Sequence, residues 1–320
     1  MKLILTGSIA YDYLMAFPGK FSEHLLPEKL DKISVSFLVE DMRKQQGGCA
    51  ANIAYSLALL GESPLLFGAA GVDFNDYKKS LDKAGVDTSG VTIFPEAFTS
   101  SFFANTDQEG NQICSFYSGA MSLVKNLSLK QILEPNADAL VLISPNDPVA
   151  MVKFAKECQE LDVPFIWDPS QQIIRLSADE LRQGAQGAKM IIVNEYELEM
   201  FLKKTALSES DLLNLAEILI VTLGEKGAVI KTGDGEIAIP VVTPGQISDP
   251  TGVGDAFRSG LLKGMMAHCS WEVAGRMGSL AATYVLETEG AQCHCYSLSE
   301  FTERYQQVFG PEAEMERVCR

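Results

Sequence analysis

The segment Asp249-Pro-Thr-Gly-Val-Gly-Asp255 brings together residue types that could transfer a phosphoryl group. Gly252 and Gly254 have no Cβ, so a phosphate could approach the backbone closely there. If a helix begins at this turn, its first N–H groups point outward and stabilise negative charge that develops on the transferring group. The candidate N–H donors are those of Gly252, Val253, Gly254 and Asp255.

Asp255, at the end of this segment, could accept the proton of an attacking hydroxyl and so act as a general base. The alternative is a glycine-rich loop whose Asp only caps a helix. The full run from Asp249 to Phe257 favours the catalytic interpretation. Arg258 lies three residues after Asp255, on nearly the same helical face. It could contact a phosphate, hold Asp255 in place or form a structural ion pair.

Along the rest of the chain, apolar runs alternate with segments of helical periodicity, and these elements must position the residues above. This alternation indicates a mostly parallel sheet with helices on both faces, a three-layer α/β/α sandwich in one domain of residues 1–320. The predicted strands are Lys2–Ile9, Pro64–Ala70, Ala139–Ser144, Pro164–Trp167, Lys189–Val193, Ile218–Leu223 and Glu236–Val242. The predicted helices are Cys49–Leu60, Phe74–Ala84, Val149–Leu161, Ala178–Gly187, Glu195–Lys203 and Ala256–Ala267.

Two segments interrupt the alternation, about residues 13–46 and 99–117. Both lack helical periodicity and are too long for ordinary loops. Each contains a short β-favouring piece, Ile33–Phe37 in the first and Ser100–Asn105 in the second. We therefore predict a small β-lid built from two insertions.

Composition limits the classes of partner. The chain has 320 residues and a net charge of -16, which would repel nucleic acid and an anionic membrane surface but does not exclude a phosphorylated substrate. The apolar start ends at Gly7 and does not indicate a signal peptide, and no apolar stretch approaches the roughly 20 residues of a membrane span. Seven scattered cysteines fit a reducing cytoplasm. We do not expect a zinc site at Cys293-His294-Cys295, because three adjacent side chains rarely converge on one metal.

Three residues near the predicted first strand and helix could hold a sugar. Asp12 lies near the C-terminal end of that strand, where open α/β sheets bind ligands, and its carboxylate could accept hydrogen bonds from two vicinal hydroxyls. Gly48 would let the backbone approach the sugar, and Asn52 lies one helical turn on. The alternatives are a turn cap for Asp12 and an ordinary buried polar position for Asn52.

The second insertion offers aromatic side chains. Phe102 and Phe116 could sandwich a planar base, although lid core or a subunit contact would explain them equally well. Gln171 and Gln172 carry paired donor and acceptor groups that suit an adenine edge. Asn194 and Glu197 open a helix after a strand, where Glu197 could order water around ATP-bound Mg²⁺ or only favour the helix dipole.

The run Asp249–Phe257 resembles the signature of the ribokinase-like (PfkB-type) sugar and nucleoside kinases. Four other stretches agree with that family in order: Gly7–Asp12 with its first strand, Gly47–Asn52 with its G-G-x-x-x-N element, Asn194–Glu197 with its N-x-x-E magnesium element, and Thr222–Gly227 with its nucleotide-binding turn. Within the family, the sequence resembles bacterial adenosine kinases at six places: Phe17–Ser22, Val35–Val39, Gln112–Tyr117, Gly119–Met121, Asp168–Gln172 and Arg258.

The resemblance implies a cytoplasmic enzyme that uses ATP and Mg²⁺ to phosphorylate the ribose 5′-hydroxyl of adenosine. It places Ser8, Phe102, Phe116 and Gln172 near adenine, and Arg175 with Asp12, Gly48 and Asn52 near the ribose. It places Asn194, Thr222, Gly224, Gly227 and Thr251 at the nucleotide, with its adenine near Ala281–Gly290, and Asp249 with Thr251 near a K⁺ site.

The first insertion resembles the segment through which bacterial adenosine kinases dimerise, with Ser36 and Phe37 reaching the partner's site. A homodimer is therefore expected, and exposed lid edges favour pairing. The rival interpretations are a sugar kinase of the same fold and a ligand-binding or regulatory protein without catalysis. Asp255, both glycines and Glu197 are all present, so the sequence gives no sign of lost catalysis.

Overall fold

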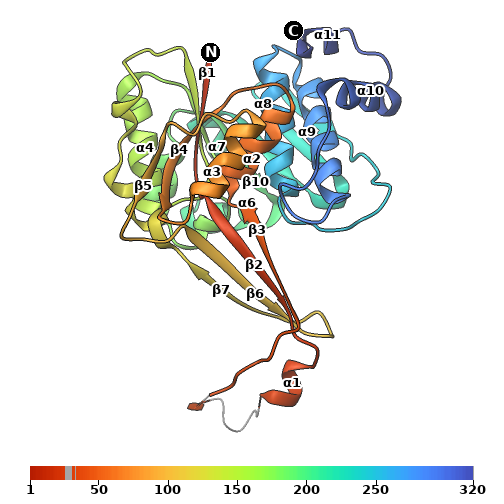
Figure 1. Cartoon of the computed structure of the whole chain (residues 1–320). Coiled ribbons are helices and arrows are strands. Elements are labelled where there is room, and N and C mark those ends of the chain that lie inside the picture. Colours follow the sequence, from red (N-terminus) through yellow and green to blue (C-terminus); the bar gives the residue numbers. More distant parts are fainter. Residues whose placement is uncertain (26–30, 33, 320) are drawn as a thin grey trace.

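The computed structural model describes residues 1–25, 31–32 and 34–319. In this part of the chain, nine strands form the main sheet in the order β13-β12-β11-β10-β9-β8-β1-β4-β5 (Figure 1). Pairing is parallel from β11 to β5 and antiparallel where β12 and β13 extend the edge. The strands are β1 (Lys2–Thr6), β4 (Leu65–Gly71), β5 (Val91–Phe94), β8 (Ala139–Ile143), β9 (Phe165–Trp167), β10 (Ala188–Asn194), β11 (Ala216–Thr222), β12 (Ala228–Thr232) and β13 (Gly235–Ile239).

Helices cover both faces of this sheet, because successive residues of its buried strands point to opposite sides. Ile4 of β1 joins one apolar cluster with Phe154 and Phe201, whereas Leu5 joins another with Ile53 and Leu261. This confirms the predicted three-layer sandwich. The helices are α1 (Phe21–His24), α2 (Cys49–Leu59), α3 (Asn75–Ala84), α4 (Pro148–Leu161), α5 (Ala178–Ala185), α6 (Glu195–Thr205), α7 (Glu209–Leu215), α8 (Val253–Met266), α9 (Trp271–Leu286), α10 (Leu298–Phe309) and α11 (Met315–Val318). Short 3-10 turns are η2 (Gly119–Asn126), η3 (Leu129–Gln131), η4 (Ser170–Ile174) and η5 (Gly224–Lys226).

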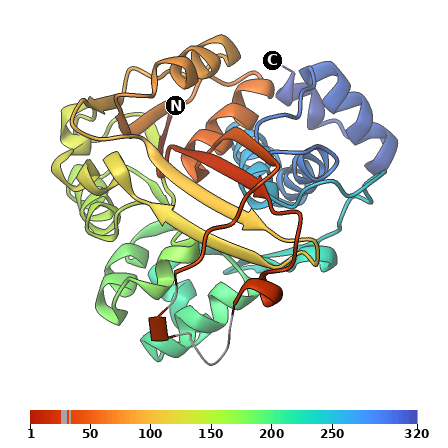
Figure 2. The same ribbon diagram turned by 60° about the horizontal axis from the view of Figure 1, so that its bottom comes forward.

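A second sheet of four strands projects from the body, in the order β3-β2-β6-β7 (Figures 1 and 2). Its strands are β2 (Ala10–Ala16), β3 (Asp41–Gly47), β6 (Ser100–Thr106) and β7 (Gln112–Tyr117). They come from the two segments that interrupt the α/β alternation, so we call this sheet the lid. Strand β2 begins at Ala10, three residues before the predicted insertion, so Asp12 lies in the lid and not at the end of the first strand. Strand β6 confirms the β-favouring piece Ser100–Asn105.

The strand prediction for Ile33–Phe37 is wrong for residues 34–37, which have no regular structure; Ile33 lies outside the described residues. The apolar side chain of Phe37 packs on Phe17 and Phe21, with ring centroids 5.1 Å and 4.8 Å away. The hydrophobic residue at this position is therefore explained by packing against other aromatic rings and not by strand pairing.

Within the described residues, the helices are either too short or too polar to cross a bilayer. Parallel strands present their carboxyl ends at one edge of a sheet, and this edge collects the polar residues of interest. Asn194 and Thr222, the last residues of β10 and β11, are register partners there.

Candidate active site

The glycine-rich turn leads directly into α8. The helix begins at Val253, three residues earlier than the predicted start at Ala256, so Gly254 and Asp255 belong to its first turn. Gly252 has φ +81°, and a Cβ there would lie 2.7 Å from Cβ of Ala291. Glycine is thus required by the backbone and by packing, in addition to any approach of a phosphate.

The N–H groups of Gly254 and Asp255 have no hydrogen-bond acceptor among the described residues. First-turn N–H groups lack intrahelical partners, and the helix dipole makes this end attractive to anions. The N–H of Val253, also predicted to face an anion, donates instead to the carbonyl of Pro250 at 3.4 Å. Anion binding at this turn stays a prediction.

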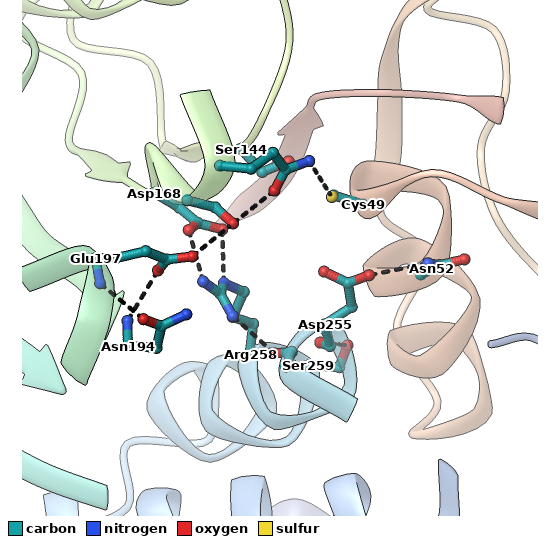
Figure 3. A network of polar contacts seen from close by, with 12 residues as sticks. Cys49, Asn52, Ser144, Asp168, Asn194, Glu197, Asp255, Arg258 and Ser259 are labelled. Atoms are coloured by element: carbon teal, nitrogen blue, oxygen red, sulfur yellow. Dashed lines mark hydrogen bonds and ion pairs between the residues drawn. The ribbon is translucent and has the colours of Figure 1, made fainter. Parts of the chain in front are cut away.

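The carboxylate of Asp255 faces α2, where its Oδ2 accepts a 2.9 Å hydrogen bond from Nδ2 of Asn52 (Figure 3). Burial raises the pKa of Asp255 to about 6, against the opposing charge of Arg258 and the bond from Asn52. A carboxylate with this pKa is mostly ionised at neutral pH and is a better proton acceptor than an ordinary Asp. Asp255 therefore has the properties of a general base.

Arg258 forms a buried ion pair with Asp168, the residue after β9. Its Nε and Nη2 each lie 2.6 Å from one carboxylate oxygen, and Nη1 donates to the carbonyl of Gly254 at 2.9 Å (Figure 3). The side chains are 8% and 1% exposed. Of the three roles open to Arg258, the structure shows the ion pair, and the carboxylate that it binds is that of Asp168 rather than Asp255.

The candidate sugar residues gather near the root of the lid. Gly48 has φ +96°, and a Cβ there would lie 2.6 Å from the carbonyl oxygen of Ser8. The hydroxyl of Ser8 accepts the N–H of Cys49 at 2.9 Å and so helps to cap α2. Burial and the charge of Asp249 raise the pKa of Asp12 to about 6.

Strand pairing in the lid places three of the predicted residues in one row. Phe102 is the register partner of Asp12 on β2 and of Phe116 on β7. Register partners point to the same side of a sheet, so one lid face carries a carboxylate beside two aromatic rings. A sandwich of a planar base between these two rings stays a prediction.

The other residues predicted to bind the nucleoside do not lie together in one row. Gln172 is buried in η4, and its Oε1 has no hydrogen-bond partner among the described residues. Arg175 is exposed at the end of η4, and Ser36 is exposed in the segment beyond the lid strands. Neither of the two cavities described next is lined by Gln172, Arg175, Ser36, Phe102 or Phe116.

Two cavities adjoin the start of α8. The smaller, of about 240 Å³, is lined by Asp255, Arg258, Glu197 and Gln171 among others. The larger, of about 630 Å³, has apolar walls that include Val241, Ile247, Ala282 and Leu286. They share Asn194, Thr222 and Gly254.

The larger cavity suits a nucleotide, because its apolar walls could hold a planar base while its inner end opens on the N–H groups of α8. It is lined by the predicted residues Asn194, Thr222, Gly224 and Gly227, and by residues of the predicted stretch Ala281–Gly290. Thr251 does not line it. Its N–H donates instead to Asp249, whose second oxygen accepts the N–H of Gly290 at 3.0 Å. A K⁺ site beside Asp249 and Thr251 stays a prediction.

Of the two roles proposed for Glu197, the structure shows the one at the helix N-terminus, and the role at Mg²⁺ stays a prediction. It forms a capping box with Asn194, with two reciprocal bonds of 2.8 Å, and its other oxygen accepts the hydroxyl of Ser170. The carboxylate still lines the smaller cavity. The described residues contain no group of three His, Cys, Asp or Glu side chains placed to hold a metal. A magnesium ion here would therefore keep waters and nucleotide phosphates as ligands.

Three site residues were not identified as such from the sequence: Asp168, Tyr77 and Gln292. Asp168 directly follows a predicted strand, a position of the same kind as that of Asp12, and this signal could have found it. Tyr77 lies within an ordinary amphipathic helix, and Gln292 lies in a loop without a pattern. Only the folded chain brings them to Asn52.

Comparison with known proteins agrees with this geometry. Residues 10–296 match the model of the pfkB family of carbohydrate kinases. A nucleoside kinase of Methanocaldococcus jannaschii is 29% identical over 306 residues, 95% of this chain and 96% of that protein. The structure of Burkholderia thailandensis nucleoside kinase in complex with inosine matches with a TM-score of 0.85 and 36% identity, over 97% of this chain and 99% of that chain. This chain therefore belongs to the pfkB family of carbohydrate kinases and is a phosphotransferase with a hydroxyl acceptor.

Proposed function

We propose that the enzyme phosphorylates the ribose 5′-hydroxyl of a purine nucleoside with ATP, and that adenosine is its acceptor. The observation that carries this proposal is the lid row of Asp12, Phe102 and Phe116. A carboxylate suits the two vicinal hydroxyls of a ribose, and neighbouring aromatic rings suit an attached base. The nucleoside kinases named above support the same class of acceptor.

In the proposed reaction, Asp255 takes the proton of the 5′-hydroxyl while the N–H groups of Gly254 and Asp255 stabilise the charge on the transferring phosphoryl group. Mg²⁺ bound to ATP would neutralise phosphate charge, and Glu197 would order its water ligands. Asp12, Gly48, Asn52 and Arg175 hold the ribose. Closure of the lid brings Phe102 and Phe116 onto the base and excludes water, which otherwise competes as acceptor.

Gln172 bears on the choice of base. Its side-chain amide can present either a donor or an acceptor, so it could pair with the amino group of adenine or with the oxygen of hypoxanthine. Inosine is therefore the nearest alternative acceptor. A free sugar such as ribose or fructose is the second alternative, and it would have no use for the aromatic pair.

A panel of adenosine, inosine, guanosine, ribose and fructose tests the assignment, with release of ADP as the measurement. We expect adenosine to give the highest kcat/KM, and a preference for ribose would overturn the nucleoside assignment. Phe116→Ala should raise KM for the nucleoside about 5- to 150-fold, since stacking on one base contributes ~1–3 kcal/mol. Phe98→Ala is the matched control, because Phe98 is an exposed ring that precedes β6 and lies outside the lid strands.

The dependence of activity on pH follows from the two carboxylates. Asp255 must be ionised to accept a proton and Asp12 to accept two hydroxyls, and each has a raised pKa of about 6. Because only the ionised forms act, activity is present at a pH above both pKa values and is lost as the pH falls through them and the carboxylates become protonated. Both pKa values are raised, so this loss occurs at a higher pH than for an ordinary Asp. We expect kcat/KM to fall between about pH 7 and pH 5 with a slope that approaches two groups. A profile that is flat to pH 5 with a folded protein would contradict both assignments.

We further propose that two copies associate through the lid. The lid face opposite Asp12 leaves Met42, Phe103 and Ile113 exposed, and an exposed apolar sheet face favours burial against a second copy. Sedimentation velocity should therefore show a dimer, and a monomer across the micromolar range would exclude it.

A further inference from the structure

The loop after α9 brings Gln292 between the catalytic base and the root of the lid. Its Nε2 donates one hydrogen bond to Oδ1 of Asn52 at 2.8 Å and a second to the hydroxyl of Tyr77 at 2.5 Å. That hydroxyl in turn donates to the carbonyl of Gly47, the last residue of β3, at 2.8 Å. The two N–H groups of the Gln292 amide are therefore both used.

These bonds determine which end of the Asn52 amide faces Asp255. The two ends of an amide are opposite in character, because its oxygen only accepts and its nitrogen only donates. Since Gln292 donates to the oxygen of Asn52, the nitrogen is left to donate to Asp255, which it does at 2.9 Å. Without Gln292, the Asn52 amide could turn and present its oxygen to the carboxylate.

The loop that carries Gln292 is held firmly against α2. The hydroxyl of Tyr55 donates to the carbonyl of His294 at 2.9 Å, and the hydroxyl of Ser56 lies 3.1 Å from Nε2 of the buried His294 ring. Together with the bond to Asn52, these contacts join the loop to one helix at three side chains, so the loss of one contact leaves the other two in place.

We propose that Gln292 is a positioning residue for the phosphoryl transfer: it holds the donor end of Asn52 toward Asp255 and links the catalytic base to the lid through Tyr77 and Gly47. This inference rests on the role of Asp255 as general base, but it does not depend on which hydroxyl compound is the acceptor.

The surroundings of Asp255 show why this bond matters. Arg258 on α8 stabilises the ionised carboxylate, whereas Asp168 after β9 and Asp12 on β2 destabilise it. The titratable side chains of Cys49 and Tyr77 also face it from α2 and α3. Among the described residues, the neutral donor of Asn52 is thus the side-chain hydrogen bond that favours the ionised base, and its orientation is set by Gln292.

Gln292→Glu is the sharpest test, because it keeps size and shape but replaces a donor with an acceptor. The Asn52 amide should turn its nitrogen toward the new carboxylate at position 292 and its oxygen toward Asp255, which disfavours the ionised base. We expect kcat to fall about 10- to 100-fold, a scale typical of small misplacement. The acid limb of the kcat/KM profile should move to higher pH, while KM for ATP should stay within about 2-fold of wild type.

Two further variants complete the design. Gln292→Met keeps the volume and removes both donors without adding charge, so it should move the acid limb in the same direction and carries the test if Gln292→Glu does not fold. Ser56→Ala is the matched control: it removes a contact between the same loop and helix outside the chain of bonds to Asp255. It should leave both kcat and the acid limb unchanged.

Assays use the 320-residue chain with ATP and whichever hydroxyl compound of the panel it phosphorylates fastest. If no nucleoside is phosphorylated, the proposed function fails, but the acid limb measured with a sugar still tests Gln292. A wild-type kcat and acid limb in either folded Gln292 variant would overturn the inference. So would an equal shift in Ser56→Ala, because the effect would then come from the loop as a whole.

Discussion

Replacement of Asp255 by Asn is expected to lower kcat at least ~10²-fold while acceptor binding stays close to that of the wild type. The two side chains have the same shape, and the oxygen of an Asn at this position could still accept the N–H of Asn52, now 2.9 Å from Oδ2 of Asp255. The amide cannot take a proton from the attacking hydroxyl. The loss should therefore appear in kcat rather than in the dissociation constant for the nucleoside.

Steady-state kinetics and calorimetric titration with adenosine separate these two quantities. The pH profile adds an independent check, since the variant should retain the acid limb of Asp12 and lose that of Asp255, so that the slope falls from two groups toward one. Asp76→Asn is a suitable control because Asp76 is an exposed Asp that pairs with Lys79 on α3. A variant at position 255 that turns over near the wild-type rate would remove Asp255 from the mechanism.

The candidate base and the turn before α8 could be located from the sequence because both lie within one short stretch, Asp249–Asp255. Glycines next to a small-residue helix are a local signal, and their consequence is local. The start of the helix at Val253 was missed because glycines argue against helix by propensity, whereas in the structure Gly252, with φ +81°, is the residue that directly precedes the helix.

The partners of these residues could not be predicted, because they lie far away in sequence. Asn52 meets Asp255 across 203 positions, Gln292 meets Asn52 across 240, and Asp168 meets Arg258 across 90. Hydrophobic periodicity indicates which elements form but not which of their ends become neighbours. That depends on the order of strands in the sheet.

The lid shows the same limit. Its existence followed from two long segments without helical period, but the row formed by Asp12, Phe102 and Phe116 depends on parallel pairing of β2 with β6. A shift of one residue would send Phe102 to the opposite face. The register therefore carries the argument for a nucleoside, and the amino-acid pattern alone left lid core as an equal alternative.

Loss of the Arg258 side chain should have the largest effect on stability. Arg258→Ala would leave the carboxylate of Asp168, now 1% exposed, buried without its partner. Removal of one member of a buried ion pair costs about 3–5 kcal/mol in the free energy of unfolding. Urea denaturation followed by circular dichroism measures it, and Lys79→Ala, which breaks an exposed pair, should change the free energy by less than ~0.5 kcal/mol.

A double variant separates the structural role of Arg258 from its effect on the reaction. Asp168→Leu with Arg258→Met replaces the pair by apolar side chains, an exchange that is often neutral or stabilising, so most of the lost stability should return. The charge that lowers the pKa of Asp255 would still be missing, together with the opposing charge of Asp168. Because the effect of Arg258 is the larger of the two, the acid limb should move to higher pH in a protein that is fully folded.

The stability of Arg258→Ala also shows whether the carboxyl group of Asp168 is ionised. Burial raises the pKa of Asp168, and the guanidinium of Arg258 opposes that rise. If Arg258→Ala were as stable as the wild type at neutral pH, Asp168 would have to become protonated at little cost, and the pair could not be a strong constraint on the turn at Gly254. A large loss that shrinks as the pH is lowered would instead show that the cost comes from burying an unpaired carboxylate, which protonation relieves.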